Sequence, residues 1–319
     1  MREHDDPPAP ASPSLWAGID EAGYGPNLGP LVMTAVVAEG RSPDLWADLA
    51  ATVARAGGDA DRLWVDDSKL VYQGRKGRDR LDAACLAAVA ASGRGRPPTF
   101  GALLEAVGAG TLDDAELAHW VDADPPIAAD GAPHAEPRAC EHWRIVEVRS
   151  VVVGPMRFNA DLESTGSKAL VHFRAFARLL GHVWGRVGEG ISASVVSDKH
   201  GGRHYYAGPL ADAFPDAWLD RGPEGPDLSR YTLRAGPRRL DLRLRPRADA
   251  ADGLVALASI VSKSIREHWM DAFNAHWTAR FPDLRPTAGY PGDSSRFRAA
   301  IEPACLERGL AHSVWWRAK

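Results

Sequence analysis

Several features are scarce in this chain of 319 residues, and each scarcity excludes a class of protein. Only three cysteines are present, and they lack metal-ligand spacing, so neither a disulfide framework nor a cysteine–zinc site is expected. No apolar run approaches the roughly 18 residues of a membrane span. The first residues lack the basic region and hydrophobic core of a secretory signal. We therefore expect a cytoplasmic protein that does not enter a membrane.

The chain also lacks an overall excess of basic charge. Its net charge is −4 and its pI is about 6.3, which does not by itself indicate a nucleic-acid-binding protein. The basic residues are nevertheless clustered, because residues 229–247 are rich in arginine with a single aspartate, and residues 69–80 are also basic. Either segment could follow the phosphate backbone of a duplex. The alternative is a solvated surface in a chain with a general arginine bias.

The most informative segment is residues 15–38, in which two apolar runs flank an acidic, glycine-rich bend. The first run ends in Asp20 and Glu21, and the pattern predicts two buried strands joined by a bend. Carboxylates at the end of a central strand are costly to desolvate, and a divalent cation is the usual compensation. An isolated Asp-Glu-Gly sequence is more often a solvated turn, so the interpretation depends on where other acids fall.

Other strand-like segments also end in an acid. Residues 192–198 form a short apolar run ending in Asp198, and residues 240–249 alternate apolar and charged positions and end in Asp249. If these strands are neighbours of the first run in one sheet, their carboxylates converge at one edge. Asp252 competes with Asp249 as the fourth acid.

Short motifs in a fixed order carry a family resemblance. In chain order they are DEAGYG at 20–25, DSKL at 67–70, the lone Asp198, RAD at 247–249, ASIVSK at 258–263 and GYPG at 289–292. Together they resemble the motifs of the type 2 ribonucleases H, the ribonuclease HII and HIII group. The intervening segments do not visibly match, and long insertions are expected near 93–145 and 199–239.

One motif departs from the family pattern. The family turn that reads the ribose 2′-hydroxyl at an RNA–DNA junction is glycine-arginine-glycine, whereas this chain has Gly23, Tyr24 and Gly25. The backbone amides could still make that contact, but the guanidinium contact to phosphate is lost. The fourth acid, Asp249, corresponds to the HII branch and not to the glutamate of the HIII branch.

The alternation of strands and helices predicts an α/β protein with helices on both faces of a mixed sheet, and the resemblance implies a ribonuclease H-like fold. It also implies a metal-dependent endoribonuclease that cleaves RNA–DNA hybrids or ribonucleotide-containing duplex DNA, leaving 5′-phosphate and 3′-hydroxyl ends. Two Mg²⁺ or Mn²⁺ ions are expected. We assign Asp20, Glu21, Asp198 and Asp249 as catalytic residues and metal ligands, with Asp20 as the bridging ligand. Because adjacent strand residues point to opposite faces, Asp20 and Glu21 converge only if the strand bends.

Other residues are candidates for substrate contact. These are Gly23, Tyr24, Gly25, Lys69, Ser259, Lys263 and Tyr290. Ser259 and Lys263 lie four residues apart on one helix face, which suits them to binding a phosphate together. Lys263 could instead pair with an active-site acid. Tyr290 could press against the deoxyribose beside the junction or simply pack. His200, close to Asp198, could shuttle a proton, although the family does not normally use a histidine there.

Two alternative functions stay open. The chain could cut another nucleic-acid structure, or it could be a non-catalytic nucleic-acid-binding protein of the same fold.

Local patterns also predict the elements. Strands are expected near 15–20, 30–38, 144–153, 192–198 and 240–246, and helices near 42–56, 77–92, 167–185, 208–214, 253–275 and 294–308. The stretch 93–113 is ambiguous and 121–139 is expected to be a loop. We expect residues 1–14 to be a disordered tail, residues 15–319 to form one domain, and the protein to be a monomer.

Overall fold

The protein is organised around a seven-stranded mixed sheet with the strand order β5-β2-β1-β6-β9-β8-β7. The computed structural model describes residues 14–128 and 143–318. The strands are β1 (Ser14–Ala22), β2 (Leu31–Gly40), β5 (Trp143–Val153), β6 (Ser192–Asp198), β7 (Trp218–Glu224), β8 (Ser229–Ala235) and β9 (Arg238–Arg245). A separate pair is formed by β3 (Val53–Ala54) and β4 (Leu63–Trp64).

The centre of the sheet is parallel. Strand β1 pairs in parallel with β6, with Ile19 opposite Ser197, and β6 pairs in parallel with β9, with Asp198 opposite Arg245. The outer strands on both sides are antiparallel to their neighbours. The carboxyl ends of β1, β6 and β9 therefore meet at one edge of the sheet, as the sequence predicted.

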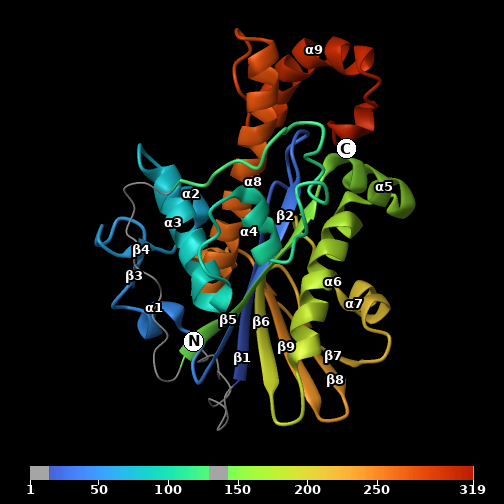
Figure 1. The fold of residues 1–319 in the computed structure, drawn as a ribbon. Helices are drawn as coiled ribbons and strands as arrows, with labels where there is room; N and C mark the ends of the chain where they lie inside the picture. Colours follow the sequence, from blue (N-terminus) through green and yellow to red (C-terminus); the bar gives the residue numbers. More distant parts are fainter. Residues whose placement is uncertain (1–13, 129–142, 319) are drawn as a thin grey trace.

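Helices lie on both faces of the sheet (Figure 1), which confirms the predicted fold class. The helices and short helical turns are α1 (Leu45–Asp48), α2 (Ser68–Val71), α3 (Gly77–Val89), η1 (Ala90–Arg94), α4 (Phe100–Ala106), α5 (Pro155–Thr165), α6 (Lys168–Arg186), α7 (Ala207–Ala213), η2 (Ala248–Ala250), α8 (Gly253–Arg280), α9 (Pro291–Glu307) and η3 (His312–Val314). One hydrophobic cluster joins α3, α4 and α8 to the sheet, and a second joins α6 and α7 to its other face.

Helix α8 approaches the central strand very closely. A Cβ atom at Gly18 would lie 2.2 Å from the backbone of Leu254 and of Val255, so only glycine at this position of β1 allows the contact. About two turns further along α8, Ser262 donates a hydrogen bond from its Oγ to the carbonyl oxygen of Asp20. The close packing thus fixes α8 against the acidic end of β1.

The far end of α8 projects beyond the sheet and carries α9 (Figure 1). The chain then returns over residues 310–318 to the bend after β1, where the backbone N–H of Arg317 donates to the carbonyl of Asn27. Trp315 and Arg317 are both buried there, each with 1 % of its surface exposed. The C-terminal segment is therefore part of the wall around the acidic strand ends.

Three regions differ from the sequence-based expectations. The helix predicted over 42–56 is wrong beyond its first turn, because Val53 and Ala54 leave the helix to pair with Leu63 and Trp64. The hairpin of β7 and β8, and the helix α5, were not predicted. The expected N-terminal tail and residues 129–139 of the expected loop lie outside the described residues, apart from Ser14, which begins β1.

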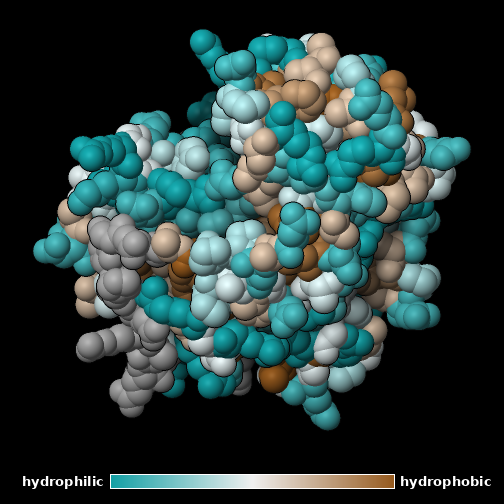
Figure 2. Space-filling view, turned by 45° about the horizontal axis from the view of Figure 1, so that its top comes forward, coloured by the Kyte–Doolittle hydropathy of each residue, from teal (hydrophilic) through white to brown (hydrophobic). Residues whose placement is uncertain are grey.

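The surface is mostly hydrophilic on the face drawn in Figure 2, where hydrophobic residues occur in small separate areas. The large apolar side chains that are exposed come from separate parts of the chain, including Leu70, Met156, Ile191, Trp218 and Leu306. Among the described residues, no helix is both long enough and apolar enough to cross a membrane.

Candidate active site

Three aspartates meet at the carboxyl ends of the parallel strands. Asp20 follows the last residue of β1 that pairs with β6, so it lies beside Asp198 at the end of β6. Asp249 is in the short turn η2, which follows β9 directly. Asp20 is the most buried of these acids, with 7 % of its surface exposed. Residues separated by more than two hundred positions are thus brought to one edge of the sheet.

The proximity of these carboxyl groups affects their ionisation. Burial raises the pKa of Asp20 well above its usual value, and the charges of Glu21 and Asp249 raise it further. Burial also raises the pKa of Asp198, with additional contributions from Asp249 and Glu21. The pKa of Asp249 is raised by burial and by the nearby carboxylate of Asp67. The site is therefore an anionic cluster that disfavours full ionisation.

Glu21 lies on the opposite face of the strand from Asp20. The ladder between β1 and β2 continues without irregularity to Ala22, so the bend that would bring both side chains together does not occur. The Glu21 carboxylate instead faces α6, where its Oε2 lies 3.3 Å from Nε2 of His172. The negative charge of Glu21 is nevertheless close enough to raise the pKa values of Asp20 and Asp198.

His172 and His200 form a buried pair behind Glu21. Their ring centroids are 4.5 Å apart, and only 3 % of the surface of His200 is exposed. His200 also packs against Phe176 and Tyr206, and burial lowers its pKa well below the usual value. His200 thus lies among the residues of the second hydrophobic cluster, and its packing there explains its position in the core.

The DSKL motif lies against the acids, because Asp67 and Lys69 both act on the charge of Asp249. Asp67 caps the short helix α2 by accepting a hydrogen bond from the backbone N–H of Lys69. Ser68 and Ser259 of α8 are joined through their hydroxyl groups at 3.0 Å. Ser259 also lies within hydrogen-bonding reach of the Asp20 carboxylate, which partly offsets the rise in the pKa of Asp20. The two motifs therefore form one wall of the site.

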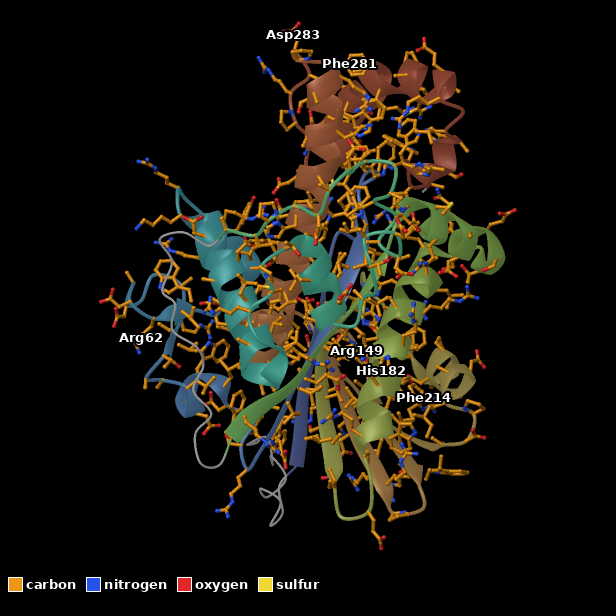
Figure 3. The ribbon with its side chains drawn as sticks, viewed as in Figure 1. Arg62, Arg149, His182, Phe214, Phe281 and Asp283 are labelled. Carbon is orange, nitrogen blue, oxygen red and sulfur yellow. The ribbon has the colours of Figure 1, made fainter. Side chains whose placement is uncertain are left out.

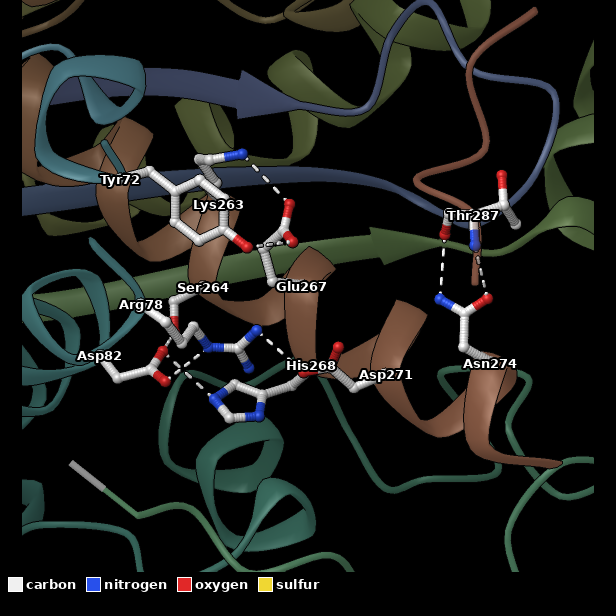
Figure 4. Close-up of polar contacts among 10 residues, drawn as sticks. All are labelled: Tyr72, Arg78, Asp82, Lys263, Ser264, Glu267, His268, Asp271, Asn274 and Thr287. Carbon is white, nitrogen blue, oxygen red and sulfur yellow. Dashed lines mark hydrogen bonds and ion pairs between the residues drawn. The ribbon is translucent and has the colours of Figure 1, made fainter. Parts of the chain in front are cut away.

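Lys263 is paired with a residue that the sequence did not single out. Its Nζ lies 3.1 Å from the Glu267 carboxylate, which also accepts a hydrogen bond from the Tyr72 hydroxyl. The ammonium group lies over the Tyr72 ring, 4.3 Å from its centroid. Figure 4 shows this group beside a second polar cluster on α8. The alternative partner suggested for Lys263, an active-site acid, is not the partner found.

The glycine turn after β1 is hydrogen-bonded to an arginine of the C-terminal segment. Gly23 has φ of +87°, which favours glycine. Arg317 donates hydrogen bonds to the carbonyl oxygens of Gly23 and Tyr24, at 2.7 and 2.9 Å. Because the C=O and N–H of a trans peptide point in opposite directions, the amides of Tyr24 and Gly25 are directed away from Arg317. The turn can therefore offer amides to a ligand, as expected from the sequence.

The two tyrosines near the turn, Tyr24 and Tyr290, differ in how accessible their rings are. The Tyr24 ring packs edge-on against His172, at 4.8 Å between centroids, and against the loop at Gly201. Tyr290 is 52 % exposed, and the guanidinium of the buried Arg266 lies 5.6 Å from its ring centroid. Tyr290 is thus accessible to a ligand, whereas Tyr24 is largely committed to packing.

Asp252, the competing fourth acid, caps α8. Its Oδ1 accepts hydrogen bonds from the backbone N–H groups of Leu254 and Val255. This role accounts for its position, and it leaves Asp249 as the acid that follows β9.

The donor chemistry of the site fits a hard divalent cation. All the candidate ligands are carboxylates, and Mg²⁺ and Mn²⁺ prefer oxygen ligands. Within residues 14–128 and 143–318, no three acidic, histidine or cysteine side chains surround a common point closely enough to hold an ion. The site therefore matches a divalent cation in the type of its ligand atoms and in its negative charge.

Several residues of the site could not be identified from the sequence. His172 falls among apolar positions of α6, where a polar side chain at a core position is the only local clue. Arg317 and Glu267 have no pattern that marks them, because their partners are distant in the sequence or belong to another element.

The chain was compared with known proteins. No family model and no curated protein matches it. Solved structures of similar fold include a chain of the PCNA:RNase HII complex from Archaeoglobus fulgidus, at 17 % identity over 96 % of this chain and 94 % of that chain, with a TM-score of 0.42. Another is ribonuclease H2 from Pyrococcus horikoshii OT3, at 14 % identity over 94 % and 92 % of the two chains, with a TM-score of 0.48.

A third is Bst-RNase HIII in complex with Mn²⁺, at 17 % identity over 95 % of this chain and 66 % of that chain, with a TM-score of 0.42. At these identities and TM-scores the functional argument rests on the residues of this chain.

Proposed function

We propose that this protein is a metal-dependent endoribonuclease that hydrolyses the RNA strand of RNA–DNA hybrids and leaves 5′-phosphate and 3′-hydroxyl ends. The observation that carries the proposal is the meeting of Asp20, Asp198 and Asp249 at the ends of three adjacent parallel strands. Serine and lysine side chains of two further motifs lie against these acids. This arrangement is suited to holding divalent cations, which would in turn bind the anionic phosphodiester.

Two divalent cations held at Asp20, Asp198 and Asp249 would make a water molecule more acidic and stabilise the leaving oxyanion. Glu21, on the other face of β1, would contribute its negative charge from behind the strand. The residues of the chain supply the binding and the orientation. Ser259, whose hydroxyl is hydrogen-bonded to Ser68, lies against the buried Asp20 carboxylate and lowers its pKa.

The substrate would be held by the groups around this cluster. Lys69 is close enough to Asp249 to lower the pKa of that carboxyl group, and its ammonium group would contact a substrate phosphate. The outward amides of Tyr24 and Gly25 would contact the ribose 2′-hydroxyl, which distinguishes RNA from DNA at a given position. Tyr290, which is exposed, would contact the sugar beside the junction.

The test uses duplexes that contain one ribonucleotide, four ribonucleotides or none, each incubated with Mg²⁺ or Mn²⁺. The wild type is compared with Asp20→Asn and Asp198→Asn, and with Asp212→Asn as a control, because Asp212 is exposed on α7 away from the strand ends. We expect cleavage at ribonucleotides that falls at least about a hundredfold in the first two variants and is unchanged in the control.

The products distinguish the possible specificities. Cleavage at a single ribonucleotide would show that the turn reads a junction without the arginine of the family motif. Cleavage of only the four-ribonucleotide duplex would indicate specificity for longer RNA tracts. An absence of metal-dependent cleavage on every duplex would overturn the proposed activity.

A second candidate is a nucleic-acid-binding protein of the same fold without turnover. It is favoured by the packing of Tyr24 against His172 and by the lack, among the described residues, of a preformed cage for an ion. Tight binding of the same duplexes without metal-dependent cleavage would decide for this candidate.

A further inference from the structure

An arginine outside the recognised motifs connects the DSKL motif to the turn that carries Asp249. Arg55 follows β3 directly. Its Nε and Nη2 donate to the two carboxylate oxygens of Asp66, at 2.8 and 2.9 Å, and Nη2 also donates to the carbonyl oxygen of Ala250, at 3.0 Å. Asp66 directly precedes Asp67 of the DSKL motif, and Ala250 directly follows Asp249. One guanidinium group therefore joins the neighbours of two acids of the site.

The orientation of the Arg55 side chain is well defined, although 46 % of that side chain is exposed. An exposed ion pair usually contributes little to stability, but a bidentate arginine–carboxylate contact has a fixed geometry. Asp66 is buried, with 5 % of its surface exposed, and it also accepts a hydrogen bond from the backbone N–H of Ala56. The Arg55 guanidinium lies over the Trp46 ring, 4.1 Å from the ring centroid. The carboxylate and the ring together hold the guanidinium in place.

The turn η2, which carries Asp249, depends on support from outside. Arg247 directly before it has φ of +54°, in the left-handed region that is unfavourable for residues other than glycine. Such a conformation persists only where the surrounding structure holds it. The backbone of Ala248 lies within hydrogen-bonding reach of the Asp198 carboxylate, and Arg55 binds the carbonyl oxygen of Ala250. Contacts from two other segments thus hold the turn.

The short pair of β3 and β4 brings Arg55 to this position. Val53 pairs with Leu63 in parallel register, so that Arg55 and Asp66, which are eleven residues apart, lie side by side after the two strands. This pair is separate from the seven-stranded sheet. The pairing that replaces most of the helix expected over 42–56 therefore supplies a support for the candidate site.

We propose that Arg55, oriented by Asp66, is a positioning residue that holds Asp249 in place for a divalent cation. The inference rests on the proposed function for the ion that is bound, but it concerns metal binding and does not require turnover. Arg55 acts through the backbone of the turn and touches neither the ion nor the substrate. Without Arg55, an ion would have to order the turn as it binds, and that ordering reduces its affinity.

The experiment measures the binding of Mn²⁺ in the absence of nucleic acid. Free Mn²⁺ is quantified by electron paramagnetic resonance during titrations of the wild type, Arg55→Ala and Arg55→Lys. We expect Arg55→Ala to weaken Mn²⁺ binding by about 10–100-fold, as is typical when a residue that orients a metal ligand is removed. Arg55→Lys should give an intermediate affinity, because an ammonium group does not reproduce the planar bidentate contact.

Arg62 provides a matched control in the same part of the chain. Its Nε lies 3.3 Å from the Asp59 carboxylate, and its Nη1 donates to the carbonyl oxygen of Ala50 at 2.8 Å. These are the same kinds of contact that Arg55 makes, but both partners belong to residues 50–59. Figure 3 shows Arg62 at the outer edge of the molecule, in the region of β3 and β4. Arg62→Ala should change Mn²⁺ affinity by less than about twofold. Urea unfolding verifies that each variant is folded.

A second background separates positioning from a general effect on the fold. Asp249→Asn removes the carboxylate that Arg55 positions. In this background, Arg55→Ala should weaken Mn²⁺ binding further by less than about twofold, because the two changes act on the same ligand. A residue that only stabilised the fold would lower the free energy of unfolding and leave the Mn²⁺ affinity of the folded protein unchanged.

The outcomes separate this inference from the proposed activity. Mn²⁺ binding by Arg55→Ala that is as tight as in the wild type overturns the inference, even if the wild type cleaves hybrids. An equal loss in Arg62→Ala, or an undiminished loss in the Asp249→Asn background, overturns it as well. A loss specific to Arg55 that disappears in the Asp249→Asn background supports the inference even if the wild type cleaves no duplex.

Discussion

The Asp20 carboxylate lies where its charge opposes folding. Burial raises its pKa, and Glu21 and Asp249 add repulsion. A buried charge without a compensating partner is costly to the folded state. The position of the Asp20 carboxylate is thus suited to binding a cation, but it destabilises the folded protein.

This conflict leads to a prediction about Asp20→Asn. In EDTA we expect the variant to have a free energy of unfolding about 1 kcal/mol higher than that of the wild type, because a buried repulsive charge is removed. With millimolar Mn²⁺ the wild type should gain stability by ligand binding and the variant should gain less. Urea unfolding with and without Mn²⁺ measures both effects. A lower stability of the variant in EDTA would contradict the assignment of repulsion at this site.

Asp82 on α3 shows the opposite balance, because its charge is compensated. Its carboxylate accepts hydrogen bonds from Arg78 and from Ser264, and Nε2 of His268 lies 3.2 Å away (Figure 4). Burial by itself would raise the pKa of Asp82, but these partners outweigh it and hold the pKa below its usual value. Arg78 also pairs with Asp271.

The lowered pKa of Asp82 gives a pH dependence with a definite sign. The stabilisation is fully present above the unfolded pKa of about 3.9 and is lost as the pH falls through the lower, folded pKa. At pH 7 we expect Asp82→Asn to lower the free energy of unfolding by about 3 kcal/mol. Below about pH 4 the difference between wild type and variant should shrink. Urea unfolding at pH 7 and at several acidic pH values measures this, and a difference independent of pH would contradict it.

Individual site residues were predictable when a local pattern marked them. Asp20 and Asp198 each end an apolar run, so the strand-end position of their carboxylates followed from the sequence. Arg317 and His172 lie in segments with no such mark, and their contacts with the turn and with Glu21 depend on how distant segments pack. A single sequence contains no information on such pairs.

At the scale of elements, the first turn of α8 depends on a cap. Asp252 satisfies two N–H groups that have no partner within the helix. We expect Asp252→Ala to lower the free energy of unfolding by about 1 kcal/mol, whereas Asp252→Ser should preserve the cap and most of the stability. Cleavage by the serine variant should resemble the wild type, and Asp249→Asn should abolish it. The reverse result would make Asp252 the fourth acid.

Elements were predicted well where one face is buried and the pattern is long. The strands β1, β2, β5, β6 and β9 were found because their apolar runs or alternation extend over several residues. The hairpin of β7 and β8 was missed because Gly222 and Pro223 interrupt β7 and charged residues occupy its exposed edge. The helix expected over 42–56 was reduced to one turn by the competing pairing of β3 with β4, which is a tertiary effect.

At the scale of the whole molecule, the C-terminal segment (residues 310–318) connects the projecting end of α8 and helix α9 back to the sheet. Removing residues 314–319 would remove the buried Trp315 and Arg317 and leave the carbonyls of the glycine turn without their donor. We expect a loss of about 3–5 kcal/mol in the free energy of unfolding. Leu306→Ala is the control, because Leu306 is 71 % exposed and should change stability by less than about 0.5 kcal/mol. Chemical denaturation measures both, and an unchanged stability of the shortened chain would contradict the role of this segment.

The parallel order of β1, β6 and β9 also has a consequence for the synthesis of the protein. Of the acids at the ends of these strands, Asp20 and Asp249 are separated by more than two hundred residues, and the glycine turn near residue 23 receives its donor from residue 317. Contacts of such long range form late in folding. A nascent chain on the ribosome would therefore carry Asp20 long before it could complete the acidic cluster. If the proposed activity is correct, the enzyme cannot cut nucleic acid until nearly all of its chain has been made.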